Sequence, residues 1–160
     1  MVDAQTISIV FAGLSIGVAA FYYILTIRNA QRTREAQVFL QFSNRMADDR
    51  FIDGLQDLRE LDWARWREHA KDSEMRERWR NVMYILMSFE DLGGFVRGGY
   101  LSIPIIAYTT TGPIRLAWEA IAPIIEDWRE ATHNPRNFSE LEYLYKEIMR
   151  YHREHPELTA

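Results

Sequence analysis

The stretch Ala4–Ile27, AQTISIVFAGLSIGVAAFYYILTI, runs for 24 residues without a charged side chain. A helix of about 20 apolar residues, rising roughly 1.5 Å per residue, spans a hydrocarbon core of about 30 Å. The run exceeds the roughly 7–15 apolar residues of a cleaved secretory signal, and Met1–Asp3 carries no basic side chain. We therefore expect residues 1–27 to be a retained transmembrane anchor and residues 28–160 to form a separate domain.

Basic residues occur on one side of the apolar run. All 19 lysines and arginines follow Ile27, beginning with Arg28, Arg32 and Arg34. Because Lys and Arg are enriched on the cytoplasmic side of membranes, we expect a single-pass protein of the cell membrane, with its N-terminus outside and residues 28–160 in the cytoplasm. Arg28 and Arg32 share a helix face and are placed to bind anionic lipid headgroups. The alternative is that they fix the topology alone.

Small residues interrupt the apolar run at helical spacing. Gly13 and Gly17 form a G-x-x-x-G pair, which allows two helices in a membrane to approach closely. This pair predicts a helix–helix interface, either in a homo-oligomer or with another membrane protein. No ionisable side chain lies within Ala4–Ile27, and such side chains mark ion and proton pathways. A transport function is therefore disfavoured.

The charge balance and the cysteine count exclude several functions. The chain carries a net charge of −4, and its mean hydropathy is −0.29 despite the apolar run. A mildly acidic domain is poorly suited to the phosphate-dominated binding of nucleic acids. The sequence contains no cysteine, which excludes disulfides, thiolate metal sites and cysteine nucleophiles.

After the apolar run the apolar spacing stays helical, and no stretch shows the alternation of a strand. No glycine or proline occurs between Gly17 and Gly54, so helix is expected to continue from the span to about Asp48. We therefore expect an all-α fold, in which the span continues into a cytoplasmic bundle of about four to six helices. Further helices are predicted at about 50–70, 74–97, from Ser102 and Pro104 onward, from 112 to 132, and from 139 to Pro156.

Several residues predict where these helices begin, end or bend. Ser73 is a plausible N-cap of the helix over 74–97, and the glycines at 98–99 are expected to end that helix. Pro123 is expected to kink the helix over 112–132. Ser139 and Glu142 have the spacing of a capping box and are expected to open the last helix.

Two adjacent acids interrupt an apolar stretch at Glu90 and Asp91. Buried carboxylates can have raised pKa values that suit acid–base chemistry, so this pair is a candidate pocket. We favour the alternative, a structural ion pair of one of the acids with Arg97 or Arg115. Adjacent helical residues point about 100° apart, so at least one of the two acids is expected to face solvent.

Two histidine patterns are candidate metal sites. Glu130 and His133 match half of a di-iron carboxylate site, but the sequence contains no second Glu-x-x-His. His152 and His155 are three residues apart but lie in the last ten residues, where helices fray. Serine-nucleophile, P-loop and dinucleotide-binding signatures are also absent from the sequence. We therefore predict no catalytic residue, cofactor or metal ligand.

Three segments together resemble a functionally uncharacterised family of short bacterial and archaeal proteins. Members of this family have one N-terminal transmembrane helix followed by a small helical domain. The resemblance implies this architecture and supplies no activity and no site residues. The segments are Tyr22–Gln37 (YYILTIRNAQRTREAQ), Phe89–Ile103 (FEDLGGFVRGGYLSI) and Ala117–Tyr145 (AWEAIAPIIEDWREATHNPRNFSELEYLY).

These observations favour a membrane-tethered, non-catalytic helical module for interaction or assembly, which self-associates or docks a partner at the inner leaflet. The alternative is a membrane-anchored enzyme or ligand-binding domain that uses the Glu90–Asp91 region. A third interpretation, an oligomeric pore, is disfavoured by the uncharged span. The sequence does not identify a partner, a subunit number or a signal.

Overall fold

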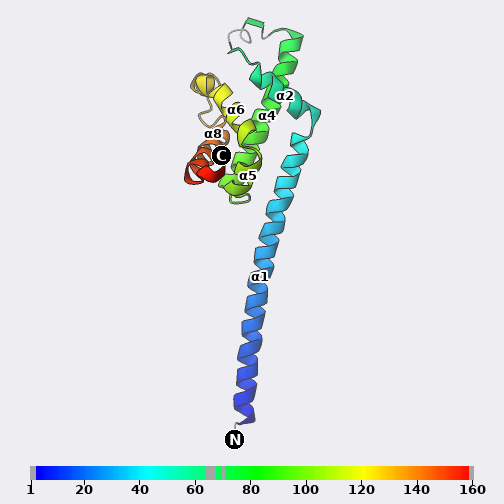
Figure 1. The fold of residues 1–160 in the computed structure, drawn as a ribbon, viewed down its shortest axis with the longest axis vertical. Helices are drawn as coiled ribbons and strands as arrows, with labels where there is room; N and C mark the ends of the chain where they lie inside the picture. The colour runs from blue at the N-terminus through cyan, green and yellow to red at the C-terminus, as the bar shows by residue number, and fades with distance from the viewer. Residues whose placement is uncertain (1–2, 64–67, 70, 159–160) are drawn as a thin grey trace. The chain divides into compact units, whose positions relative to one another are not determined.

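The computed structural model of the chain describes residues 3–63, 68–69 and 71–158. Within these ranges the secondary structure is helical and contains no strand, which confirms the predicted all-α class. The longest element is α1, Ala4–Met46 (Figure 1). By its internal contacts the chain divides into two units, Met1–Gln37 and Val38–Ala160. The sequence-based division at residue 27 refers to the membrane, and it stays a prediction.

The first unit consists of the N-terminal part of α1. Among the described residues, one helical segment, Phe11–Met46, is long and apolar enough to cross a membrane. All side chains from 11 to 34 are exposed. The hydroxyls of Ser15 and Thr26 donate to backbone carbonyls four residues earlier, at 2.8 and 2.9 Å. These polar hydrogens are thus satisfied within the helix, as hydrocarbon surroundings require.

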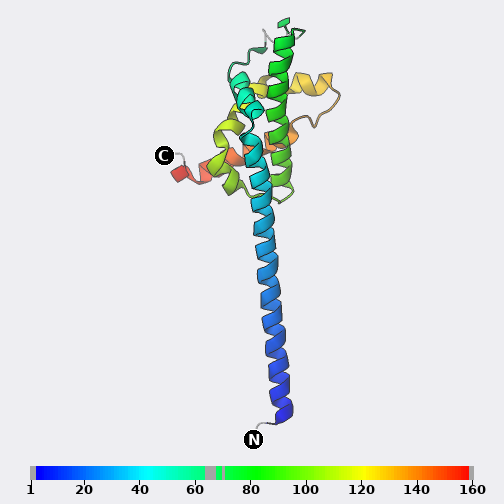
Figure 2. The same cartoon turned by 90° about the vertical axis from the view of Figure 1, so that its right-hand side faces the viewer.

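The second unit is a helical bundle with α4, Ser73–Arg97, at its centre (Figures 1 and 2). This helix packs mainly against α2, Asp49–Arg59, and α8, Ser139–Glu154. The remaining described elements are α5 (Ile103–Thr109), α6 (Thr111–Ile121), the 3₁₀ turn η1 (Ala122–Ile124), α7 (Ile125–Ala131) and the 3₁₀ turn η2 (Pro156–Leu158).

The core of the bundle forms around the apolar stripe of α4. Each fully buried side chain of this kind stabilises the fold by about 1.5–3 kcal/mol. Phe89 of α4 contacts Phe42 of α1 and Phe51 of α2, with ring centroids 5.9 and 5.7 Å apart. The last turns of α1 therefore belong to the core of the second unit. The buried members of the α4 stripe are Val82, Ile85, Leu86, Phe89, Leu92 and Val96.

The predicted helix over 50–70 is interrupted. α2 ends at Arg59 and residues 60–62 are not helical, whereas residues 63, 68 and 69 are helical. Directly after the break, the indole N–H of Trp63 donates to the carbonyl of Ala120 in α6, at 2.8 Å. Residues 64–67 and 70, which the prediction also covered, lie outside the described residues.

The other helix boundaries agree closely with the sequence. α4 begins one residue earlier than predicted, because Asp72 rather than Ser73 takes the extended backbone of an N-cap. The predicted kink at Pro123 is present as η1, which separates α6 from α7. α4 ends at the glycines 98–99 as predicted, and Gly99 has the left-handed φ of +74° that glycine adopts without strain.

Two glycines let helix backbones come into direct contact. A Cβ atom at Gly54 of α2 would lie 2.6 Å from the backbone oxygen of Asn81 in α4. A Cβ atom at Gly93 of α4 would overlap the backbone carbonyl of Glu140, in the first turn of α8. By contrast, a Cβ atom at Gly94 would have no heavy atom within 4 Å. Gly93 is therefore required by packing, whereas its neighbour is not.

These neighbouring glycines provide a matched test of the helix crossing. We expect Gly93→Ala to destabilise the protein by about 1–3 kcal/mol, because α8 must move away from α4 to admit the methyl group. Gly94→Ala is expected to stabilise by about 0.5–1 kcal/mol, because alanine favours an exposed helical position. Denaturant unfolding of the full chain in detergent measures both. Equal effects of the two substitutions would contradict the close crossing.

Candidate functional site

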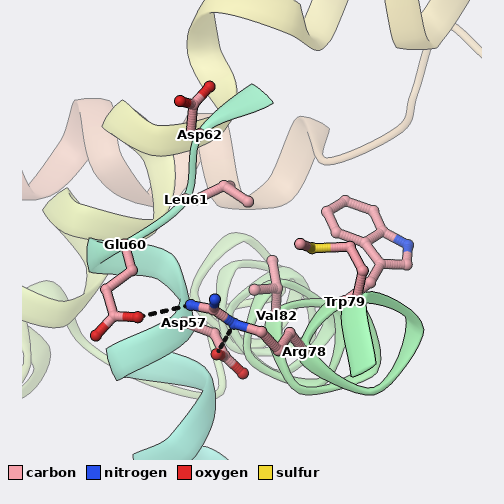
Figure 3. A pocket seen from close by; sticks show the side chains of 8 residues that line it. Asp57, Glu60, Leu61, Asp62, Arg78, Trp79 and Val82 are labelled. Atoms are coloured by element: carbon pink, nitrogen blue, oxygen red, sulfur yellow. Dashed lines mark hydrogen bonds and ion pairs between the residues drawn. The ribbon is translucent and has the colours of Figure 1, made fainter. Parts of the chain in front are cut away.

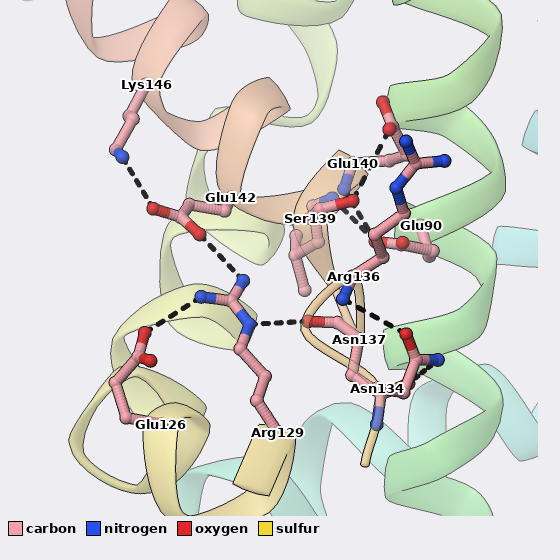
Figure 4. A network of polar contacts seen from close by, with 11 residues as sticks. Glu90, Glu126, Arg129, Asn134, Arg136, Asn137, Ser139, Glu140, Glu142 and Lys146 are labelled. Atoms are coloured by element: carbon pink, nitrogen blue, oxygen red, sulfur yellow. Dashed lines mark hydrogen bonds and ion pairs between the residues drawn. The ribbon is translucent and has the colours of Figure 1, made fainter. Parts of the chain in front are cut away.

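Glu90 lies on α4 and faces the first turn of α8. Its Oε2 atom accepts hydrogen bonds from the backbone N–H groups of Glu140 and Leu141, at 3.0 and 2.8 Å (Figure 4). The first N–H groups of a helix lack partners within the helix, and a negative charge there is favourable. Glu90 therefore caps α8 from a different helix.

This contact replaces the predicted capping box, which is wrong. Ser139 is the first residue of α8 and not its N-cap, and its hydroxyl makes no capping bond. The preceding residue, Phe138, is buried and has a left-handed backbone with φ of +55°. The chain enters α8 through this left-handed residue. The free N–H groups of Glu140 and Leu141 then donate to Glu90 and not to Ser139.

The environment of Glu90 perturbs its ionisation. Burial raises the pKa of the Glu90 carboxyl, and repulsion from Glu140 adds to this shift. The hydrogen bonds from the two amides and the charge of Arg129 lower the pKa, but they do not cancel the rise. Such a shift is common at catalytic carboxylates. Here, however, the Oε2 atom of Glu90 already accepts two backbone hydrogen bonds, which favours a structural role over a catalytic one.

Asp91 faces a different side of α4. Its Oδ2 atom pairs with Arg45 of α1 at 3.1 Å, and both side chains are about half exposed. The predicted partners are wrong, because Arg97 pairs with Glu140 and Arg115 pairs with Glu119. The structure does not bring the two acids together: Glu90 faces α8 and Asp91 faces α1.

A second charged cluster, which the sequence did not suggest, centres on Arg129 of α7 (Figure 4). Its guanidinium donates to the carbonyl of Asn137 at 3.1 Å, to Glu126 at 2.9 Å and to Glu142 of α8 at 2.8 Å. Burial alone would raise the pKa of Glu142, but Lys146 and Arg129 together lower it. The spacing of Glu126 and Arg129 on one helix face was the available signal. The cluster holds the segment between α7 and α8 in place.

A small cavity lies between α2 and α4 (Figure 3). Its volume is about 30 Å³, room for one or two water molecules and not for a substrate. Arg78 at its edge pairs with Asp57 at 2.6 Å and with Glu60 at 2.7 Å, and Asn81 donates to the other oxygen of Asp57. These polar groups satisfy one another, so the cavity offers no free charge to a ligand.

The histidines occupy separate places in the fold. His133 follows α7 with a left-handed φ of +51°, and it does not complete a metal site with Glu130. His152 contacts the hydroxyl of Thr111 at 2.8 Å, and His155 contacts Glu157. In the part of the chain that the structure describes, no three His, Asp or Glu side chains converge on a position for a metal ion.

The remaining site predictions fall on α1. Gly13 and Gly17 leave a shallow notch in the helix surface, bordered by Leu14, Val18 and Phe21. No heavy atom lies within 4 Å of a Cβ position at either glycine. The basic side chains that follow the apolar run, at 28, 32 and 34, are all exposed.

The fold defines a class of protein: an all-α chain in which one long apolar helix leads into a small helical bundle. The chain belongs to the family described as a domain of unknown function, DUF4760, whose sequence profile matches residues 9–148. The predicted membership of a functionally uncharacterised family is therefore confirmed. The match includes most of the apolar run and extends into α8. Comparison with curated proteins finds no match, and comparison with solved structures finds none either.

The burial of Glu90 predicts a distinctive effect of pH on stability. Because the pKa of Glu90 is raised in the folded chain, its contribution is complete below 4.5, the ordinary value, and is lost as pH rises through the raised value. Glu90→Gln keeps an acceptor oxygen and does not titrate. We expect the stability of the native chain relative to this variant to fall across that pH range.

Glu90→Ala tests the hydrogen bonds of Glu90 separately from its ionisation. Neither this variant nor Glu90→Gln titrates at residue 90, and Ala leaves two amides without their acceptor, so we expect Glu90→Ala to be less stable than Glu90→Gln by about 1 kcal/mol at all pH values. Thermal unfolding of the full chain in detergent, followed by circular dichroism, measures both variants. If the native chain and Glu90→Gln show parallel pH profiles, the environment described for Glu90 is wrong.

Proposed function

We propose that this protein is a membrane-tethered, non-catalytic helical module that assembles with itself or docks a membrane partner at the inner leaflet. In this proposal α1 crosses the cell membrane with its N-terminus outside, and residues 28–160 lie in the cytoplasm. The observation that carries the proposal is the exposure of every apolar side chain described between residues 11 and 27.

An exposed apolar helix is unfavourable in water. Ile16 is 71% exposed and Phe21 is 64% exposed, and burying a side chain of this size gains about 1.5–3 kcal/mol. The helix is long enough to span a bilayer, and the hydroxyls of Ser15 and Thr26 donate within the helix. Both properties favour lipid as the surroundings. The family match over residues 9–148 supports a shared role for the apolar helix and the bundle.

The notch at Gly13 and Gly17 supports self-association. The chain itself places nothing against either glycine, so a second helix can approach this face closely. The exposed Arg28, Arg32 and Arg34 support the orientation and a contact with anionic headgroups.

A second candidate is an enzyme or ligand-binding domain that uses Glu90, and the raised pKa of this residue is the observation in its favour. The bonds from Glu90 to the amides of Glu140 and Leu141 favour a structural role instead. An oligomeric pore stays the weakest candidate, because the span has no ionisable side chain to line one.

Membrane integration and orientation can be tested in cells. We expect the intact chain to stay in the membrane pellet after alkaline carbonate extraction. Because the sequence contains no cysteine, single cysteines report topology: Asp3→Cys should react with an impermeant reagent on intact cells, and Asn44→Cys should react after permeabilisation. Release of the full-length chain by carbonate, or a mature form that begins beyond residue 20, would refute the proposal.

Self-association can be tested by energy transfer in vesicles. A cysteine at Asn29 carries donor or acceptor dyes, and we expect transfer between full-length chains. Gly13→Leu or Gly17→Leu should reduce the transfer, because the added side chain fills the notch. Ala19→Leu is the matched control: it adds a leucine two residues after Gly17, about 200° around the helix. Equal transfer in all variants would remove this interface.

A further inference from the structure

One segment of the bundle has no charged residue. Gly98–Ile114, GGYLSIPIIAYTTTGPI, contains 17 residues without a charge, whereas 26% of the whole chain is charged and about four charges would be expected. The segment comprises the turn after α4, the whole of α5 and the start of α6. It is flanked on both sides by arginine, at Arg97 and Arg115.

The segment presents aromatic side chains to the outside. Tyr100 is 59% exposed and Tyr108 is 66% exposed. Tyr100 is held outward by the turn: its N–H donates to the carbonyl of Phe95 at 2.9 Å, and its ring packs edge-on against the Phe95 ring. A Cβ atom at Gly98 would collide with the Tyr100 ring at 2.9 Å. The outward position of this tyrosine is therefore fixed by the backbone.

The threonine hydroxyls of the segment are satisfied internally. Thr109, Thr110 and Thr111 each donate to the backbone carbonyl four residues earlier, at 2.9, 3.3 and 2.8 Å. Unsatisfied donors are costly away from water, and back-bonding to the helix removes that cost. Exposed tyrosines on an uncharged surface are typical of a surface that meets the polar–apolar boundary of a bilayer.

The chain keeps this surface within reach of lipid. Residues 28–38 belong to the continuous helix α1, and ten residues of helix are about 15 Å long. The second unit begins at Val38, so it is held close to any membrane that contains residues 4–27. Within that unit, Figures 1 and 2 both show α5 at the same end of the bundle as the start of its own part of α1, residues 38–46.

From these observations we propose that the Gly98–Ile114 surface is a second membrane contact, which lies on the headgroup region of the bilayer that holds α1. Tyr100 and Tyr108 enter the interface, and the exposed Arg97 and Arg115, which pair with Glu140 and Glu119 in the bundle, flank it. This inference rests on the proposed membrane anchoring. A lipid surface fits better than a protein partner because the exposed residues of the segment are uncharged and include two tyrosines, and because only about ten helical residues separate the bundle from the proposed span.

The absence of cysteine allows a direct test in the full-length chain. Tyr100→Cys and Tyr108→Cys each carry an environment-sensitive fluorophore, in vesicles that contain anionic lipid. We expect a blue-shifted emission, and quenching by lipids brominated near the headgroup end of the acyl chain. Ile52→Cys on α2, where the native side chain is 55% exposed, is the matched control and should show neither effect. The same fluorophore on Leu14→Cys reports whether the proposed transmembrane segment lies in lipid.

The outcomes separate the two proposals. If the probe at Leu14 is not quenched, the membrane anchoring itself fails. If Leu14 is quenched but the probes at Tyr100 and Tyr108 behave like the control at Ile52, the anchoring stands and the second contact is refuted. Cross-linking of the probe sites to another protein copy, with protection from the brominated lipid, would assign the surface to that copy and refute a lipid contact.

A charge substitution gives an independent readout. With the probe at Tyr100, Tyr108→Asp should restore the emission of an aqueous probe, because a carboxylate opposes entry into the interface. Ile52→Asp should leave the emission unchanged. Matching circular dichroism spectra show that both variants are folded. Unchanged emission in Tyr108→Asp would refute the membrane contact.

Discussion

The contact between α4 and the first turn of α8 is the constraint on which the bundle depends. Gly93 allows the two backbones to touch, and Glu90, one turn earlier, supplies the acceptor for the amides of Glu140 and Leu141. α8 therefore has a satisfied N-terminus when it is packed against α4, so its secondary and tertiary structure form together. The buried side chains that α8 adds to the core are Leu141, Leu144 and Ile148.

The fold was predictable where the sequence signal is local. The long apolar run, the α4 stripe, the stop at the glycines 98–99 and the break at Pro123 each follow from residues near the element they control. The end of α2 and the cap of α8 were not predictable in this way. Both depend on partners far along the chain, since Trp63 bonds to Ala120 and Glu90 bonds to the amides of α8. A capping box at Ser139 agreed with the local sequence pattern. In the structure, however, the carboxylate of Glu90 in α4 accepts the hydrogen bonds of the α8 amides.

The candidate site shows the same limit. Adjacent acids in an apolar helix suggested a structural ion pair with Arg97 or Arg115 or, alternatively, a pocket at Glu90 and Asp91. The structure uses one acid for a helix cap and the other for a surface ion pair with a different partner, Arg45. The Arg129 cluster joins α7, α8 and the segment between them through contacts at 3.1 Å or less. In the described part of the bundle, these charged side chains hold helices in place. Two surfaces that these contacts leave open among the described residues are the notch at Gly13 and Gly17 and the Gly98–Ile114 surface.

Pairing of helices through the notch at Gly13 and Gly17, as proposed, would lower the affinity that the surfaces of the attached bundles need in order to bind one another. Chains embedded in one bilayer diffuse in two dimensions, so pairing of their spans raises the effective concentration of the attached bundles for one another. A contact too weak to be detected between free molecules then becomes populated through avidity. Under the proposed membrane anchoring, selection on the surfaces of the bundle can therefore favour reversible, low-affinity encounters, with pairing of the apolar helices providing most of the association free energy.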